Sequence, residues 1–99
     1  MTCCINRLTA IGSKQQVKRF HSSRWATALG AKHCELLENS PTRFACQFET
    51  EAAPLESLRR LSRRWPRLIL LLEYEVDEER IKGLAKAAAA KLEHYQIEY

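Results

Sequence analysis

The feature that most constrains the fold of this 99-residue chain is a strict two-residue alternation over residues 43–50. Successive side chains of a strand point to opposite faces, so the alternation sorts these residues into two sets. One set is Phe44, Cys46, Phe48 and Thr50, and the other is Arg43, Ala45, Gln47 and Glu49. An apolar face backed by a polar face predicts a half-buried strand in an antiparallel sheet.

Three further strands are expected around this one. Residues 67–76 contain the apolar run Leu68 to Leu72, which predicts a central strand with both faces covered. Looser alternation over residues 3–11 predicts a strand, and residues 33–37 are a weaker candidate. Pro41 then predicts a turn before the alternating strand, because proline fixes φ at the second turn position.

Two helices are expected between these strands. Ser13 followed by Gln16 matches a capping box, so a helix should run over residues 14–24, and residues 25–32 leave open an extension toward Gly30. Pro54 suits the start of a second helix that ends before Pro66. The apolar stripe of the second helix consists of Leu55, Leu58, Leu61 and Trp65.

The C-terminal stretch supports two readings. Residues 82–92 are rich in alanine, the best helix former, and predict a helix. Residues 93–99 alternate strictly, with Tyr95, Ile97 and Tyr99 on one face, and this pattern predicts a strand. A hairpin that turns near residues 89–91 is therefore the alternative to the helix.

The order of elements, β-α-β-β-α-β and an additional element, predicts an α+β fold. Two helices covering one face of an antiparallel sheet give the ferredoxin-like, split βαβ arrangement. The length of the chain limits it to a single domain over residues 1–99.

A resemblance to a known family follows from short segments spread over residues 3–84. These segments are Asn6-Arg7-Leu8-Thr9-Ala10-Ile11-Gly12, the Phe-x-x-x-Phe-x-Thr pattern of residues 44–50, Trp65-Pro66, Tyr74-Glu75 and Gly83. Together they resemble the YubB ferredoxin-like family, small proteins of bacteria, their plasmids and their phages. The resemblance implies a ferredoxin-like fold, a cytoplasmic location and a C-terminal stretch that adds strands to the sheet. It implies no activity and supplies no catalytic residue.

An arginine cluster is the first candidate binding site. Arg59, Arg60, Arg63, Arg64 and Arg67 stand together without an intervening acid. Guanidinium groups bind phosphates and carboxylates in a bidentate manner, so the cluster is a candidate site for an anionic partner. Two structural explanations compete with this one. Basic residues are favoured at the C-terminal end of a helix, and the acidic run of residues 73–79 would neutralise the cluster within the molecule.

The second candidate is the C-terminal edge, carried by Tyr95, Ile97 and Tyr99. An exposed edge strand can pair with another chain, so this segment predicts an interface with a protein partner, including a homodimer. The alternative is that the tyrosines pack on their own sheet.

No chemical motif points to an enzyme. The sequence lacks nucleotide-binding, hydrolase and metalloprotease motifs, and Cys3, Cys4, Cys34 and Cys46 lack metal-ligand spacing. The first residues lack a secretory leader pattern and no segment is apolar enough to span a membrane, so we expect free thiols in a reducing compartment. We therefore expect no catalytic residue, metal or cofactor, and a cytoplasmic, non-enzymatic interaction or accessory module. A nucleic-acid-binding accessory protein is the alternative, consistent with a pI of about 9.0.

Overall fold

The computed structural model describes residues 3–99; Met1 and Thr2, on which the expected absence of a leader partly rests, lie outside them. The elements are β1 (Cys4–Ile11), α1 (Lys14–His21), α2 (Trp25–Leu29), β2 (Lys32–Ser40), β3 (Arg43–Thr50), α3 (Leu55–Arg64), β4 (Ile69–Val76), the 3₁₀ turn η1 (Asp77–Glu79), β5 (Ile81–Ala88) and β6 (Lys91–Glu98). The predicted α+β class is confirmed by this mixture of strands and helices.

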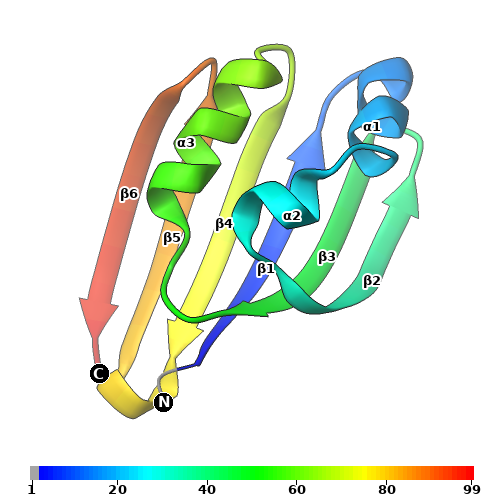
Figure 1. The fold of residues 1–99 in the computed structure, drawn as a ribbon. Coiled ribbons are helices and arrows are strands. Elements are labelled where there is room, and N and C mark those ends of the chain that lie inside the picture. The colour runs from blue at the N-terminus through cyan, green and yellow to red at the C-terminus, as the bar shows by residue number, and fades with distance from the viewer. Residues whose placement is uncertain (1–2) are drawn as a thin grey trace.

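The strands form a single antiparallel sheet in the order β2-β3-β1-β4-β5-β6. All three helices lie on the same side of this sheet, and the other side is open (Figure 1). The face of the sheet that the helices cover forms the core with them, and we call the other face the open face.

Among residues 3–99, no helix has the length and apolar character needed to cross a membrane.

The first helical segment is shorter than predicted. The Ser13 cap is confirmed, because its hydroxyl accepts a hydrogen bond from the Gln16 amide at 3.2 Å. The expected helix over residues 14–24 is wrong in its end, since α1 ends at His21 and α2 follows as a separate helix. At the break, the Ser23 hydroxyl donates to the Phe20 carbonyl at 2.6 Å, a local bond that competes with helix continuation.

The alternation over residues 43–50 is confirmed by burial of one set of side chains on the helix side. Phe44, Cys46 and Phe48 are buried there. Phe20 of α1 packs on Phe44 with ring centroids 6.2 Å apart and on Trp65 at 5.4 Å. This aromatic cluster fixes α1 against β3 and against the end of α3, because edge-to-face rings bury a large apolar area.

The prediction that both faces are covered along the run Leu68 to Leu72 is wrong. Leu70 and Leu72 are fully buried beneath the helices, but Ile69 is 38% exposed and Leu71 is only partly buried. All helices lie on one side, so alternate residues of β4 face the open side of the sheet. The run is uniformly apolar because it supplies both the core and an apolar stretch of the open face.

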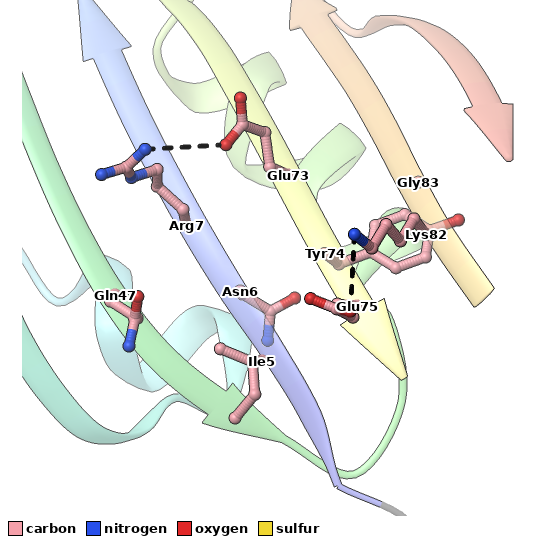
Figure 2. Close-up of a pocket in the computed structure, with 9 residues that line it drawn as sticks. All are labelled: Ile5, Asn6, Arg7, Gln47, Glu73, Tyr74, Glu75, Lys82 and Gly83. Atoms are coloured by element: carbon pink, nitrogen blue, oxygen red, sulfur yellow. Dashed lines mark ion pairs between the residues drawn. The ribbon is translucent and has the colours of Figure 1, made fainter. Parts of the chain in front are cut away.

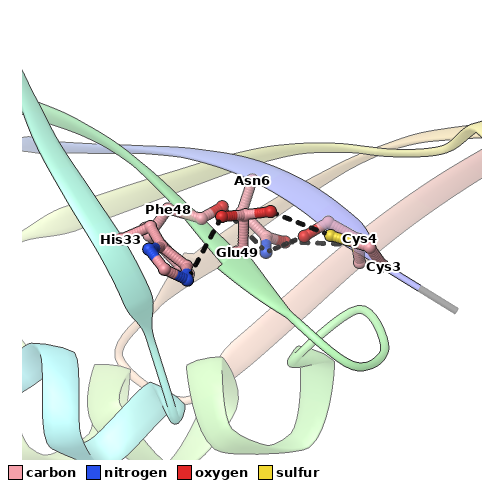
Figure 3. Close-up of polar contacts among 6 residues, drawn as sticks. All are labelled: Cys3, Cys4, Asn6, His33, Phe48 and Glu49. Carbon is pink, nitrogen blue, oxygen red and sulfur yellow. Dashed lines mark hydrogen bonds and ion pairs between the residues drawn. The ribbon is translucent and has the colours of Figure 1, made fainter. Parts of the chain in front are cut away.

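A buried asparagine, Asn6, connects the start of β1 to the end of β3 through hydrogen bonds (Figure 3). The Asn6 side-chain amide donates to Thr50 Oγ1 at 2.8 Å and to the Cys4 carbonyl at 3.3 Å. Thr50 in turn donates to the Ala52 carbonyl at 2.7 Å. A buried polar group is costly unless it is hydrogen-bonded, so this network fixes the end of β3 and the start of the loop that leads into α3.

The expected C-terminal extension of the sheet is confirmed as a hairpin, and the helical alternative over residues 82–92 is wrong. Strands β5 and β6 are joined by Ala89 and Ala90, whose φ values of 50° and 69° are typical of a type I′ turn. Ala85 and Ala87 are fully buried on the helix side, against which α3 packs. The Ala90 amide also donates to the Ser62 hydroxyl of α3 at 3.0 Å. The alanines thus act through their small size, which lets a helix approach the sheet, and packing overrides helix propensity.

Substitution of Ala89 and Ala90 should change the stability of the protein in opposite directions, depending on whether these residues form a hairpin turn or belong to a helix. Replacement of Ala89 and Ala90 by Asn and Gly should stabilise the protein by about 1–2 kcal/mol, because these residues tolerate positive φ and alanine does not. Thermal unfolding should show this as a higher melting temperature, roughly 4–8 °C for each kcal/mol. In a helix the same change would lower stability, so a lower melting temperature would contradict the hairpin.

Candidate functional site

Charge is divided unequally between the two layers of the molecule. We call residues 13–30 and 51–67, which contain the three helices, the helix layer. The helix layer carries nine Lys and Arg residues against two acids, a formal charge of +7. The remainder of the chain carries seven Lys and Arg residues against ten acids, a formal charge of −3. The net charge of +4 therefore conceals a basic helix layer on a mildly acidic sheet.

The arginine cluster separates into one paired residue and four unpaired ones. Arg59 Nε donates to Glu56 Oε2 at 3.1 Å within α3, and this bond is the main reason why the pKa of Glu56 is lowered. The other four members, Arg60, Arg63, Arg64 and Arg67, are exposed. Across residues 3–99, none of these four makes an ion pair. Their charges are therefore available to an external partner.

Within residues 3–99, the acidic run of residues 73–79 makes no ion pair with the arginine cluster. Glu73 pairs with Arg7 at 3.9 Å and Glu75 pairs with Lys82 at 3.7 Å, both on the open face (Figure 2). These residues line a shallow depression of about 510 Å³ on the open face, where each of these four charges has an opposite neighbour. The sheet therefore lies between Glu73 and Glu75 and the basic layer.

Two of the unpaired arginines line a groove between α2 and α3. The groove has a volume of about 250 Å³ and is lined by Ser57, Arg60 and Arg64 of α3, with Ala28 of α2 opposite. Residues three and four apart share one side of a helix, which brings the Ser57 hydroxyl and the two guanidinium groups to the same wall. Such donors suit the oxygen atoms of a phosphate group.

The first two helical segments add basic residues that the sequence interpretation did not single out. Lys14, Lys18, Arg19 and Arg24 are exposed, and none of them makes an ion pair within the described part of the chain. Eight exposed, unpaired cations therefore lie in the helix layer. A signal for this was present in the sequence, since residues 13–30 contain no acid at all.

The three residues of the predicted edge interface differ in their surroundings. Tyr95 is 69% exposed and Ile97 is 63% exposed, and both lie on the open face of β6 beside Leu84 of β5. Tyr99 instead packs on its own chain, where its hydroxyl donates to Glu75 Oε1 at 2.8 Å. This hydrogen bond is the main reason why the pKa of Tyr99 is raised to about 12, and repulsion of the phenolate by Glu75 and Asp77 adds to the shift. Tyr95 and Ile97 thus remain as the exposed pair.

A tyrosine–histidine–glutamine cluster that the sequence did not indicate lies on the helix side of β4 and β6. The Tyr74 hydroxyl donates to Gln96 Oε1 at 2.7 Å and hydrogen-bonds to His94 Nε2. The Tyr74 ring crosses Gly83, where an added Cβ would lie 2.0 Å from the ring (Figure 2). Burial is the main reason why the pKa of Tyr74 is raised. The cluster fastens β6 to β4 across β5, which is a structural role.

Thiol and metal chemistry find no support in the geometry. All four cysteines are free, as predicted; Cys3 and Cys34 are exposed, and Cys4 and Cys46 are buried. Burial raises the pKa of Cys46 to about 11, so its thiol stays protonated at neutral pH and is a weak nucleophile. Within residues 3–99, no three His, Cys, Asp or Glu side chains are grouped so that they could hold a metal ion.

Comparison with protein-family models, with curated proteins and with solved structures finds no match for this chain. The class of the protein therefore rests on its own geometry. It is a small α+β domain in which one face of a six-stranded antiparallel sheet is covered by a basic layer of three helices.

The hydrogen bond of Tyr99 gives a prediction that can be checked by titration. Ultraviolet absorbance should show one tyrosine ionising at about pH 12, and Tyr99→Phe should remove this component. Since the folded-state pKa is raised above the ordinary value of about 10, the stabilising effect of this group is complete below pH 10 and is lost as the pH rises toward 12.

Glu75→Gln is the matched control, because it retains Tyr99 and removes the facing carboxylate. The late component should then move toward pH 10, the ordinary range of tyrosine. A late component that persists in Tyr99→Phe would show that another tyrosine carries it.

Proposed function

We propose that this protein is a non-enzymatic accessory module that binds the phosphate backbone of nucleic acids with its helix layer. The observation that carries the proposal is the set of eight exposed, unpaired cations on one side of the sheet. Arginine and lysine that neutralise phosphates release condensed counterions, and this release drives binding that does not depend on base sequence.

The core of this module is, in our proposal, ferredoxin-like. The neighbours β2-β3-β1-β4 within the sheet, with helices on one face, support this assignment, and β5 and β6 extend the four-stranded arrangement. A relationship to the YubB family and a cytoplasmic location belong to the same proposal, and they rest on the sequence resemblance alone.

The aromatic residues of the helix layer favour backbone binding over base recognition. Recognition of single-stranded bases uses exposed aromatic rings as stacking platforms. Phe20 and Trp25 are buried in the core, and Trp65 is partly buried against Phe20. We therefore expect binding with little preference among sequences and a strong dependence on salt.

The groove between α2 and α3 gives the proposal a definite contact point. Ser57, Arg60 and Arg64 all line it, so one phosphate of the backbone would contact both guanidinium groups there. The remaining cations of α1 and the end of α3 would then contact neighbouring phosphates. A protein partner, which the sequence also predicts, would instead use the exposed edge of the sheet.

Loss of the four unpaired arginines should weaken binding strongly. Fluorescence anisotropy with a labelled oligonucleotide of mixed sequence at low salt should show binding by the wild-type protein. The R60A/R63A/R64A/R67A variant should bind about tenfold or more weakly, and the slope of log K against log salt should fall by about 3 to 4, since each phosphate contact contributes about 0.9.

A charge-matched variant on the sheet provides the control. K32A/K82A/K86A/K91A removes the same formal charge from exposed lysines of the strands and should change binding little. Equal weakening by both variants would show that net charge alone is responsible. Absence of binding by the wild-type protein at low salt would contradict the proposed function.

A further inference from the structure

The two edges of the sheet differ in regularity. Along β2, the register with β3 shifts twice, between Lys32 and Glu35 and between Leu36 and Glu38, and His33 has a φ of 54°. Bulges of this kind turn an edge away from further pairing. Strand β6 pairs with β5 in an unbroken register and contains no proline. Its free edge is therefore a regular eight-residue strand.

The backbone groups that face outward from β6 can be assigned. In an antiparallel pair, alternate residues direct both their N–H and C=O groups to the same neighbour. The Tyr99 amide donates to the Arg80 carbonyl at 2.7 Å, so odd-numbered residues face the β5 side. The outward groups accordingly belong to the even-numbered residues Leu92, His94, Gln96 and Glu98.

We propose that two copies of this chain pair antiparallel through β6, about a twofold axis that passes beside Gln96. Pairing of two outward-facing strands requires even-numbered residues opposite even-numbered residues. The axis is then perpendicular to the sheet, and the two sheets continue into one another with their open faces on the same side. About six backbone hydrogen bonds join the copies. Two form between Gln96 and Gln96 of the second copy, and two more form in each of the two pairs of His94 with Glu98.

The side chains select this register among three that are possible near the centre of β6. With the axis at Gln96, Tyr95 lies opposite Ile97 of the second copy on the open face, and His94 lies opposite Glu98 on the helix side. Apolar residues thus meet apolar residues, and a hydrogen-bonding ring meets a carboxylate.

The other two registers match less well. An axis at Tyr95 places Leu92 opposite Glu98 and Ile97 opposite Glu93, which pairs apolar side chains with acids. An axis at His94 places Lys91 opposite Ile97. Of the three registers, only the one at Gln96 places both Tyr95 and Ile97, the two most exposed large apolar side chains among residues 3–99, opposite apolar residues.

The symmetry has a consequence for the basic surface. An axis perpendicular to the sheet places both helix layers on the same side of a continuous sheet. In terms of the proposed function, a dimer would present two basic layers to one polyanion. The dimer itself does not depend on that function, because its argument uses only the edge strands.

Size-exclusion chromatography with light scattering tests the dimer. The wild-type protein should be a dimer at high concentration. Y95K/I97K places lysine opposite lysine and should raise the dimer dissociation constant at least about tenfold, to a monomer under the same conditions. Y95K/I97E places a cation opposite an anion in the register at Gln96, but lysine opposite lysine in the register at Tyr95, and should restore the dimer. Circular dichroism of each variant should match the wild type, because both positions are exposed.

A cross-link tests the axis independently. In a C3S/C34S background, Gln96→Cys should form a disulfide between the two copies on oxidation, because the two copies of residue 96 face each other at the axis. Glu93→Cys should not, because the two copies of residue 93 lie too far apart for a disulfide. A wild-type monomer at the highest soluble concentration would overturn the proposal. So would a dimer that Y95K/I97K leaves intact, or one that Y95K/I97E fails to restore. Loss of the dimer with nucleic-acid binding retained would separate this interface from the proposed function.

Discussion

Burial of only one face of the sheet is the constraint on which the rest of the structure depends. Leu8, Leu70, Leu72, Phe44 and Phe48 are wholly or almost wholly removed from solvent beneath the helices. Burying an unpaired charge is costly, so the charged side chains of α1 and α3 must turn outward, away from that core. These helices contain a single acid, Glu56, and their outward face is therefore almost purely cationic. The basic layer is a consequence of where the core lies.

The separation of charge persists because the sheet lies between the two sides. The alternation of β4 puts Glu73 and Glu75 on the open face, where they pair with Arg7 and Lys82. The molecule is about 19 Å thick along its shortest axis, whereas charges in physiological salt are screened over about 8 Å. The acids of the open face thus have little effect on the potential in front of the helix layer, and a polyanion approaching that side meets a surface with a formal charge of +7.

The C-terminal hairpin adds two strands to the sheet, and the contacts that attach it to α3 and β4 determine which edge of the sheet stays exposed. Ala85 and Ala87 allow α3 to pack closely, and Tyr74 reaches across Gly83 to hold β6. These contacts use only the helix side of the hairpin. Within the described residues 3–99, no strand pairs with the outer edge of β6, and Tyr95 and Ile97 are exposed, while the opposite edge of the sheet is interrupted by two bulges. The molecule thus has one regular edge.

The sequence by itself determined the strand over residues 43–50, the Ser13 cap and the proline-started helix, because each depends on contacts within a few residues. It also placed four of the five clustered arginines on α3, with Arg67 just beyond its end. Tertiary structure decided the hairpin, since alanine favours a helix locally but here serves as a thin layer beneath α3. The pairing of Glu73 and Glu75, the cations of α1 that join the arginines, and the Tyr74 cluster were likewise decided by the fold, because they unite residues distant in the sequence whose contacts no local pattern encodes.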